Sequence, residues 1–400
     1  MNKIQVFNTL SGTKEEFVPL QDNVVRMYAC GPTVYDLSHL GHARMAIVWD
    51  VVQRYLRFVG YDVIYVRNIT DVDDKIIKRA KELGITPEKL SRQYTYAFWH
   101  DMHSLNVESP DFEPRATEYI TQMIAFTQGL IDGGHAYEAG GDVYFDVASF
   151  KDYGKLGKQN LEQLLVGSRE QAVAQETLAH LKKSPVDFAL WKSADASELG
   201  WPSPWGRGRP GWHLECSAMV KRILGETIDI HCGGEDLVFP HHENEIAQSE
   251  ALHGQPMARY WLHNSFVQTN SEKMAKSLGN FKTIRDLLAT FSADTIRLFI
   301  LQSHYRNPID FTIESLQATS NGIQRLLRAA SFEHGLNENE TAAPSESAQK
   351  TAATFKDEFA AAMNNDFNTA IAISHLYQLA DGITQTKSAA DKQYLASTLV

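Results

Sequence analysis

Two short segments, far apart in the chain, carry side chains suited to the phosphates of a nucleotide. The first is His39-Leu40-Gly41-His42, which follows a predicted buried strand and opens a helix. A helix N-terminus attracts phosphate because its N–H groups are unpaired and it bears a partial positive charge. Gly41 lets a base or sugar approach the backbone, and the two histidines share one helical face, where both can donate to triphosphate oxygens. Taken alone, such a segment is more often a pair of surface or N-cap histidines.

The second segment is Lys273-Met274-Ala275-Lys276-Ser277, in a small and polar stretch far downstream. Two ammonium groups at this spacing can follow a pyrophosphate as its bond to the α-phosphorus breaks. Charge that is stabilised at that moment accelerates the step rather than merely tightening binding. A solvated charged loop is the usual alternative for such a pentapeptide. Because both segments lie beside predicted strand ends, the pair favours an enzyme that uses ATP.

Four side chains between or near these segments have the types that zinc accepts: Cys30, Cys216, His241 and Glu245. His241 and Glu245 are four residues apart in a predicted helix with Pro240 in its first turn, so both face the same way. Tetrahedral zinc binds S, N and O donors, and a weakly held carboxylate can make room for an incoming thiol. An ordinary pair of core cysteines with a surface histidine and glutamate is the alternative.

The same region lacks the pattern of a zinc protease. That pattern is H-E-x-x-H, and Ile246 stands where its second histidine would be needed. Cys232 and His242 are spare candidates, which we expect to be non-ligands.

An acidic segment, Gly233-Gly234-Glu235-Asp236, directly follows the third predicted strand. An acidic residue at a strand end beside glycines is well placed to accept hydrogen bonds from ribose hydroxyls. We therefore choose Asp236, with Gly234 beside it, for this role. A helix N-cap is the alternative for Asp236.

The elements that must position these residues form an α/β pattern. Predicted strands cover Val24–Ala29, Tyr61–Val66, Glu226–Ile230 and Tyr260–His263, and a helix spans Gly41 to Phe58. A strand, a helix and a strand in quick succession form a βαβ unit, which implies a parallel sheet. Ligands of such sheets bind at the carboxyl ends of the strands. We expect a Rossmann-like parallel sheet with a connective insertion, followed by an all-α C-terminal region.

Composition bounds the class of protein. The 400-residue chain, with 43% hydrophobic residues, can form two or three domains. It starts without a signal-peptide pattern, and no apolar run reaches the roughly 18 residues that span a bilayer, so we expect a soluble, cytoplasmic protein. Three cysteines favour free thiols or metal ligands over a disulfide framework. The net charge of −11 excludes a globally basic nucleic-acid binder but not a local basic patch.

One basic stretch comprises Lys75, Lys78, Arg79 and Lys81. We interpret it as a solvated helix face rather than an RNA site.

Five segments in order resemble the cysteinyl-tRNA synthetases, a family of class I aminoacyl-tRNA synthetases. They are CGPTVYDLSHLGHAR, RNITDVDDKII, WPSPWGRGRPGWHLECSAM, FPHHENEIAQSE and KMAKSLGNF. The likeness runs from Met1 to about Asp366. HLGH is similar to the HIGH segment of that class and KMAKS to its KMSKS segment, with Ala275 in place of the usual serine and both lysines kept.

The resemblance implies a cysteine–tRNA ligase. The carboxylate of L-cysteine would attack the α-phosphorus of Mg-ATP, giving cysteinyl-adenylate and pyrophosphate, and the 3′ end of tRNA(Cys) would then take the acyl group. Such catalysis is mostly positioning and charge stabilisation, so no covalent nucleophile is needed. A thiol binds zinc far better than a serine hydroxyl does, so the metal would remove the need for an editing domain. A monomer without membrane contact is expected.

The resemblance also implies roles for individual residues. One zinc ion would be held by Cys30, Cys216, His241 and Glu245. Catalytic roles fall to His39, His42, Lys273 and Lys276. ATP would be bound by His39, Gly41, His42, Gly234, Asp236, Lys273, Lys276 and Ser277. The cysteine substrate would contact Gly31, Thr70, Trp212 and His231.

Five parts are expected along the chain. They are the first half of the catalytic domain (1–132), the connective insertion (133–209), the second half with the zinc site (210–270), the KMAKS loop with a stem-contact region (271–315), and a helical domain (316–400). The helical domain would be the start of a longer tRNA-binding region, truncated or lost here. Glu333 to Lys350 is expected to be a flexible link.

Two other functions stay open on the sequence. The mycothiol-pathway ligase, which joins cysteine to glucosaminyl-inositol, would share the nucleotide and zinc sites. An idle paralogue that binds RNA or nucleotides as a regulator is the second. The intact histidine and lysine segments and the complete ligand set argue against the paralogue, and an assay of the acceptor separates the two ligases.

Overall fold

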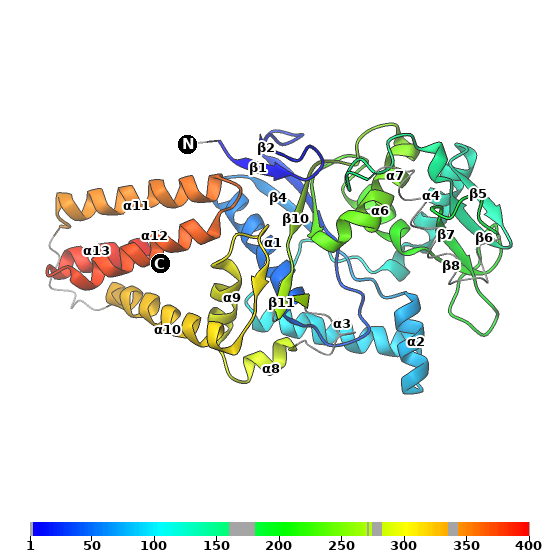
Figure 1. Ribbon diagram of the computed structural model, residues 1–400. Helices are drawn as coiled ribbons and strands as arrows, with labels where there is room; N and C mark the ends of the chain where they lie inside the picture. Colours follow the sequence, from blue (N-terminus) through cyan, green and yellow to red (C-terminus); the bar gives the residue numbers. More distant parts are fainter. Residues whose placement is uncertain (1–2, 160–180, 270–271, 274–281, 335–342, 400) are drawn as a thin grey trace.

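The computed structural model describes residues 3–159, 181–269, 272–273, 282–334 and 343–399. At its centre is a parallel sheet in the order β10-β9-β3-β4 (Figure 1). The strands are β3 (Val24–Ala29), β4 (Asp62–Arg67), β9 (Ile228–Gly234) and β10 (Ala258–Asn264). The predicted α/β fold with a parallel sheet is confirmed. Strand β9 continues through Gly234, beyond the predicted end at Ile230.

Helices cover both faces of this sheet because the side chains of a strand alternate in direction. Val25 and Met27 of β3 join the core formed with α1 (Leu40–Phe58). Tyr28, the residue after Met27, joins instead the core formed with α6 (Trp212–Ile223). Helix α1 therefore packs on one face and α6 on the other, and both begin near the carboxyl ends of the strands.

Further helices support these layers. They are α2 (Asp74–Leu83), α3 (Pro87–Ser104), α4 (Ile120–Asp132), α7 (Glu243–His253), α8 (Ile284–Leu288) and α9 (Ala293–Leu301). A hairpin of β1 (Gln5–Asn8) and β2 (Thr13–Glu16) lies along β10. A small sheet contains β11 (Val267–Thr269), β12 (Glu272–Lys273) and β13 (Ile309–Asp310).

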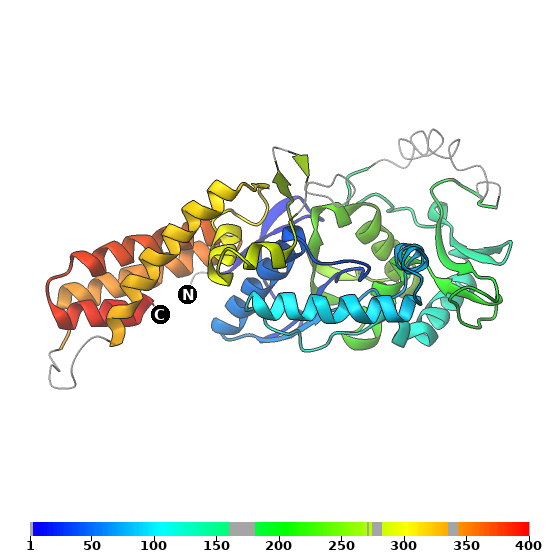
Figure 2. The same cartoon turned by 90° about the horizontal axis from the view of Figure 1, so that it is seen from below.

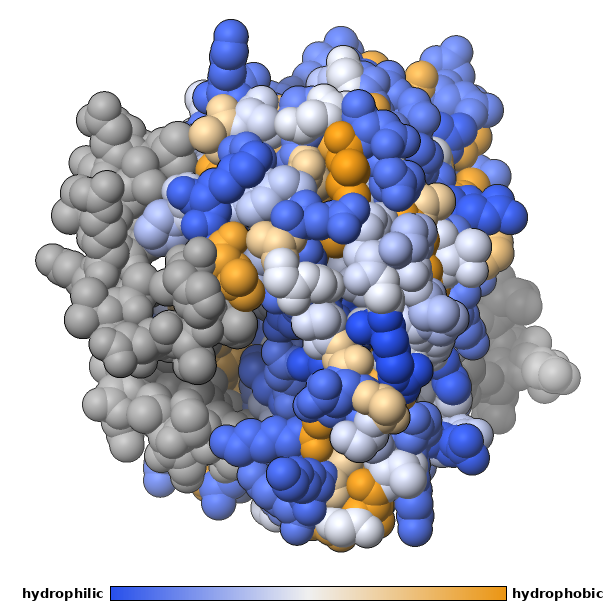
Figure 3. Space-filling view, turned by 90° about the vertical axis from the view of Figure 1, so that its right-hand side faces the viewer, coloured by the Kyte–Doolittle hydropathy of each residue, from blue (hydrophilic) through white to orange (hydrophobic). Residues whose placement is uncertain are grey.

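The connective insertion forms an antiparallel sheet with its own core. Its strands are β5 (Ala136–Ala139), β6 (Asp142–Phe145), β7 (Phe188–Ser193) and β8 (Gly208–Pro210), in chain order. They pack with α4 around buried residues such as Phe145 and Trp191. Figure 3 views the end of the molecule that carries this sheet, where the described surface is mainly hydrophilic and apolar side chains occur in small separate spots.

Helices of the described C-terminal residues form a bundle at the opposite end of the molecule from the insertion (Figures 1 and 2). They are α10 (Ile313–Ala330), α11 (Glu346–Asn364), α12 (Thr369–Gln385) and α13 (Ala389–Leu399). The predicted link from Glu333 to Lys350 is wrong at its end: Ser345 caps α11 by accepting from the N–H of Ala348, and the helix begins at Glu346. No helix among the described residues is long and apolar enough to cross a membrane.

One buried carboxylate joins the bundle to the rest of the molecule. Asp366, in the turn between α11 and α12, accepts from the N–H of Phe7 (2.8 Å), the hydroxyl of Tyr305 (2.7 Å) and Nε of Arg306 (2.8 Å). Its φ of 64° lies in the left-handed region, where non-glycine residues are uncommon. These bonds connect β1, the segment after α9 and the start of α12 at one point, which we call the Asp366 joint.

Candidate active site

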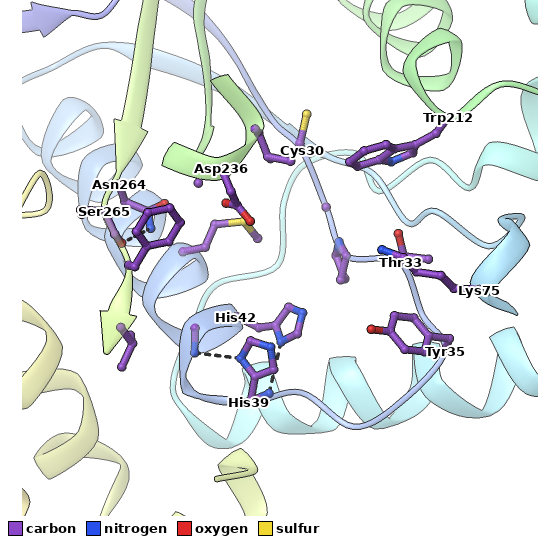
Figure 4. A pocket seen from close by; sticks show the side chains of 18 residues that line it. Cys30, Thr33, Tyr35, His39, His42, Lys75, Trp212, Asp236, Asn264 and Ser265 are labelled. Carbon is purple, nitrogen blue, oxygen red and sulfur yellow. Dashed lines mark hydrogen bonds between the residues drawn. The ribbon is translucent and has the colours of Figure 1, made fainter. Parts of the chain in front are cut away.

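A cavity of about 560 Å³ opens where the strands of the parallel sheet end. Asn264 and Ser265, at the end of β10, lie on one side of it, and Cys30 and Trp212 lie at another side (Figure 4). The start of α1 closes a third side. The ligand position that the βαβ pattern predicts therefore coincides with a cavity.

His39 and His42 line this cavity from the start of α1. His39 is the N-cap residue, and its Nδ1 accepts from the N–H of Gly41 at 3.1 Å. The N–H of His39 donates to Nδ1 of His42 at 3.2 Å, and the two ring centroids are 4.0 Å apart. The histidines thus do cap the helix, as the simpler interpretation supposed, and they also face the cavity. Gly41 is a further lining residue.

The four predicted zinc ligands converge beside this cavity. Cys30 follows β3, Cys216 lies on α6, and His241 and Glu245 flank the start of α7. One donor atom from each lies within 4.8 Å of every other, and all four residues are buried. We call these four residues the donor cluster. His241 lies in a short turn, Val238–His242, before α7, so Pro240 precedes the helix rather than occupying its first turn.

Three of four spacings in the donor cluster match the edges of a zinc tetrahedron, and the fourth, between Glu245 and His241, is shorter. The two sulfurs are 3.6 Å apart, and Sγ of Cys216 is 3.6 Å from Nε2 of His241. Sγ of Cys30 is 3.4 Å from Oε1 of Glu245, and that oxygen is 2.9 Å from Nε2 of His241. Zinc–ligand bonds of 2.0–2.3 Å give edges of about 3.3–3.8 Å in a regular tetrahedron. Two sulfurs, a nitrogen and an oxygen at these distances fit a bound metal ion.

Within the donor cluster, Cys216 and Glu245 are held in the charged forms that bind metals, whereas His241 is held as its cation and burial raises the pKa of the Cys30 thiol. Burial raises the pKa of Cys216, but its hydrogen bonds with Cys30 and His241 lower it to about 6. Burial lowers the pKa of His241, yet Glu245 and Cys216 raise it to about 10. Burial raises the pKa of the Glu245 carboxyl, whereas His231 and His241 hold it well below its ordinary value. Cys216 is therefore a thiolate at neutral pH, the form that binds metals.

Aromatic neighbours fix the ring of His241. Trp212 stacks on it with centroids 4.1 Å apart and an interplanar angle of 22°. Nδ1 of His213 lies 3.0 Å from Nδ1 of His241, so the other nitrogen, Nε2, faces the donor cluster. A partner of this kind orients a metal-binding imidazole and sets its tautomer. The sequence analysis missed His213, although its place beside Trp212 in the resembling segment was a usable signal.

A second donor set overlaps the first. Cys30, His231, His242 and Glu245 also place one donor atom each within 4.8 Å of the others, and all are buried. Nε2 of His242 is 3.2 Å from Sγ of Cys30. Its other nitrogen is 2.8 Å from Nε2 of His263. Both donor sets have the spacing of a metal site, so the expectation that His242 is not a ligand stays a prediction.

His231, expected to contact cysteine, is fully buried beneath the donor cluster. Its Nε2 lies 2.8 Å from Oε2 of Glu245, and its ring stacks on Trp261 with centroids 4.4 Å apart. It is not among the residues that line the cavity. Cys232, the spare cysteine, lies in the core on β9, with its Sγ 3.4 Å from the carbonyl oxygen of Tyr28. It belongs to neither donor set.

A network that the sequence analysis missed holds the backbone next to Cys30. Oδ1 of Asn68 accepts from the N–H of Gly31 at 2.8 Å, and its Nδ2 donates to Oγ1 of Thr70 at 3.2 Å. A Cβ on Gly31 would stand 1.6 Å from the carbonyl oxygen of Asn68, so only glycine fits there. Thr70, expected to contact cysteine, is buried and donates to Oε2 of Glu215 at 3.0 Å. Gly31 lines the cavity and Thr70 does not.

Asp236 and Gly234 line the cavity near the end of β9. Asp236 lies inside a short turn, Glu235–Leu237, and does not take the N-cap position that was its alternative. A Cβ on Gly234 would come within 2.6 Å of Oδ1 of Asp236, so the glycine leaves room for that carboxylate. An acidic oxygen is thereby placed at the cavity, where a ribose hydroxyl could donate to it.

Of the lysine segment, the backbone of Lys273 pairs with Gln268 in β11. Lys276 and Ser277 lie outside the described residues.

Comparison with known families places the chain among the tRNA synthetases. The family described as "tRNA synthetases class I (C) catalytic domain" matches residues 16–321, and the DALR domain matches residues 358–400. The cysteine–tRNA ligase of Syntrophobacter fumaroxidans is 50% identical over 385 residues, covering 94% of this chain and 77% of the relative. That of Syntrophotalea carbinolica is 52% identical over 375 residues, covering 94% and 76%. The Geobacter sulfurreducens ligase is 48% identical over 399 residues, covering 98% and 82%.

Among solved structures, the fold is similar to that of methionyl-tRNA synthetase. The Mycobacterium tuberculosis enzyme in complex with methionyl-adenylate gives a TM-score of 0.67 at 15% identity, covering 94% of this chain and 88% of that one. At this identity the likeness concerns the fold alone.

Proposed function

Because the chain belongs to the cysteinyl-tRNA synthetases, class I enzymes with cysteine–tRNA ligase activity, we propose that its cavity is the place where cysteine is activated with ATP. The chemistry is the ATP-dependent formation of cysteinyl-adenylate, followed by transfer of the cysteinyl group to the 3′ end of tRNA(Cys). The observation that carries the proposal is the convergence of two sulfurs, an imidazole nitrogen and a carboxylate oxygen beside the cavity.

The donor cluster would hold one zinc ion. When bound there, zinc would take the substrate thiol as a ligand and favour its thiolate form. Trp212, which lines the cavity, stacks on His241, whereas His231 and His242 pack against the buried Trp261, and this favours the set with Cys216 and His241 over the second set. Trp212 would cover one side of the thiol.

Selection by sulfur explains how a small cavity could reject serine. An apolar pocket separates groups of similar size by only about 10–200-fold. A site with two thiolates and an imidazole favours soft ligands, and a serine hydroxyl is a hard and weak one. Discrimination in the first step would then need no second, hydrolytic site.

The opposite parts of the cavity would bind ATP. His39 and His42 would donate to phosphate oxygens as negative charge shifts toward the departing pyrophosphate. The backbone at Gly41 would accept close approach of the nucleoside, and Asp236 would accept from the ribose. Lys273, Lys276 and Ser277 would complete the phosphate site from the lysine segment. The acid–base demands are small, since the attacking group is already a carboxylate.

The arrangement of the expected domains supports the binding of a tRNA. The connective insertion and the C-terminal bundle lie at opposite ends of the catalytic sheet, so one tRNA could contact both while its 3′ end enters the cavity. A monomer in the cytoplasm that charges one tRNA at a time would suffice, since the described site is built from a single chain.

The test combines metal analysis with two activity assays. We expect the purified chain to contain about one zinc ion, to exchange pyrophosphate into ATP only when cysteine is present, and to charge tRNA(Cys). Cys216→Ser should lose both the zinc and the cysteine-dependent exchange, while Cys232→Ser, a matched change outside both donor sets, should keep them. Wild-type exchange by a metal-free Cys216→Ser protein would refute the zinc site. Charging of glucosaminyl-inositol in place of tRNA would refute the acceptor.

A further inference from the structure

One side of the cavity has no part in the activation of cysteine as proposed above. It is lined by Thr33, Tyr35 and Lys75, and it lies opposite Asn264 and Ser265 in Figure 4. The sulfur site, the histidines of α1 and the ribose site occupy the other sides. The second half of the reaction needs room for another substrate, the end of the tRNA, and this side remains for it.

Lys75 is exposed, in keeping with the interpretation of a solvated helix face, and it also lines the cavity. It is the second residue of α2, and its N–H donates to Oδ1 of Asp73, the N-cap residue, at 2.7 Å. The cap fixes the backbone from which the side chain reaches the cavity. A cation in the first turn opposes the helix dipole, so the stability of α2 does not explain a lysine at this position.

Three nearby cations are paired with carboxylates. Lys192 and Arg209, from the insertion, both bind Asp74 at 2.6 and 2.9 Å, and Arg79 pairs with Glu82 at 3.1 Å. Within the part of the chain that the structure describes, Lys75 forms no ion pair at this end of α2. Burial raises the pKa of the nearby Asp73 carboxyl, and the positive charge of Lys75 partly offsets this rise. An ammonium group that faces a cavity without an ion pair is suited to bind an anion.

Tyr35 adds the second feature of a nucleotide site. It is a half-buried aromatic residue on the same side of the cavity as Lys75. Single-stranded nucleic acids are commonly bound by aromatic rings that stack on bases, next to cations that contact the backbone phosphates. A lysine provides a compact point charge for such a phosphate.

We propose that Lys75 binds the phosphodiester on the 5′ side of the terminal nucleotide of tRNA, and that Tyr35 stacks on its base. The inference rests on the proposed function, since it assigns the acceptor to a side of the same cavity. The ribose hydroxyl oxygen bonds to the carbonyl carbon of the adenylate, the bond from that carbon to the phosphate oxygen breaks, and AMP leaves with the electron pair. The hydroxyl proton passes to the departing phosphate.

The experiment separates the two half-reactions in the full chain. Cysteine-dependent ATP–pyrophosphate exchange reports the first step, and single-turnover transfer from preformed cysteinyl-adenylate to tRNA(Cys) reports the second. In Lys75→Gln the ratio of transfer to exchange should fall by about tenfold, the effect of losing one charge-assisted hydrogen bond. Lys75→Arg should recover most of it. Lys78→Gln, a matched change one turn along α2, should leave the ratio at the wild-type value.

Two further readouts identify the phosphate and the base. Binding of tRNA to the Lys75→Gln protein should depend less steeply on salt, with a slope smaller by about 0.7–1 in log–log form. Tyr35→Leu should lower transfer, and Tyr35→Phe, which keeps the ring, should not.

The outcomes that would overturn the proposal are specific. Exchange that falls in parallel with transfer in Lys75→Gln would mean that Lys75 binds a phosphate of ATP. An unchanged ratio with an unchanged salt slope would mean a surface lysine only. If instead the wild-type chain itself showed no cysteine-dependent exchange, the proposed function would fail, which is a different result from either.

Discussion

Two fully buried carboxylates lie at different places in this molecule, and their surroundings differ in kind. Glu245, beside the cavity, is surrounded by His231, His241 and the sulfur of Cys30. Asp366, at the joint of the helical bundle, has a different histidine, His304, near its Oδ2. It accepts instead from a backbone N–H, a phenol and a guanidinium. Both carboxylates are satisfied, and burial alone does not distinguish them.

The types of donor distinguish the two carboxylates. Around Glu245 stand groups that can lose their protons and bind a soft metal, and they meet within 4.8 Å of one another. Around Asp366 stand groups that keep their protons and hold the carboxylate in place, so that three segments stay together. The comparison teaches that a buried acid indicates chemistry only when its neighbours can exchange their protons for a ligand.

The largest effect should come from the Asp366 joint. In Asp366→Ala the N–H of Phe7, the Tyr305 hydroxyl and the Arg306 guanidinium lose their common acceptor, which we expect to lower the free energy of unfolding by about 3–5 kcal/mol. Thermal or denaturant unfolding measures this value. Zinc bound per folded chain should stay at the wild-type level. A zinc loss in folded Asp366→Ala protein would abolish the distinction between the two carboxylates.

The next effect, smaller in free energy, is expected at Glu245, where the property that changes is zinc affinity rather than stability. Glu245→Gln keeps the shape and one carbonyl oxygen but removes the charge, so zinc affinity should fall by at least the roughly 10–100-fold that is lost when a group that only orients a ligand is changed, as measured by competition with a chelator. In proteins treated with a chelator, Glu245→Gln should shift the unfolding midpoint much less than Asp366→Ala does. Equal zinc affinity in the Glu245→Gln and wild-type proteins would remove Glu245 from the ligand set.

The smallest effect should come from Cys232, which belongs to neither donor set. Cys232 is buried in the core, and Cys232→Ala removes one sulfur atom, at a cost of about 1 kcal/mol in unfolding free energy. Zinc content and cysteine-dependent exchange should be those of the wild type. Loss of zinc here would show that the sheet around Cys232, rather than the donor types, controls the metal site.

The sequence predicted the parallel sheet because the apolar strands and the helix between them follow regular patterns. It also named Cys30, Cys216, His241 and Glu245, whose side-chain types are limited to a few uses. It favoured His241 over His242, but it could not show that a short irregular turn before α7 brings His241 to Cys216 and His242 to Cys30.

Other features leave no pattern in the sequence. The contact of Asn68 with Gly31 depends on how the segments after β3 and β4 approach each other, which neither segment specifies alone. The direction of Lys75 depends on the cap at Asp73 and on the position of α2 beside the cavity. Such contacts are set by tertiary packing, whereas strands and helices are set largely by local periodicity.

The Asp366 joint also bears on the order in which the chain can fold. Phe7 and Asp366 are separated by 359 positions, so β1 must wait for all the residues between them before this bond can form. Contacts of such long range slow folding, and the N-terminal part of a growing chain folds first where it can. The β1–β2 hairpin would therefore be secured to the bundle only after Asp366 has been made, so this attachment forms after both the catalytic core and the start of the bundle.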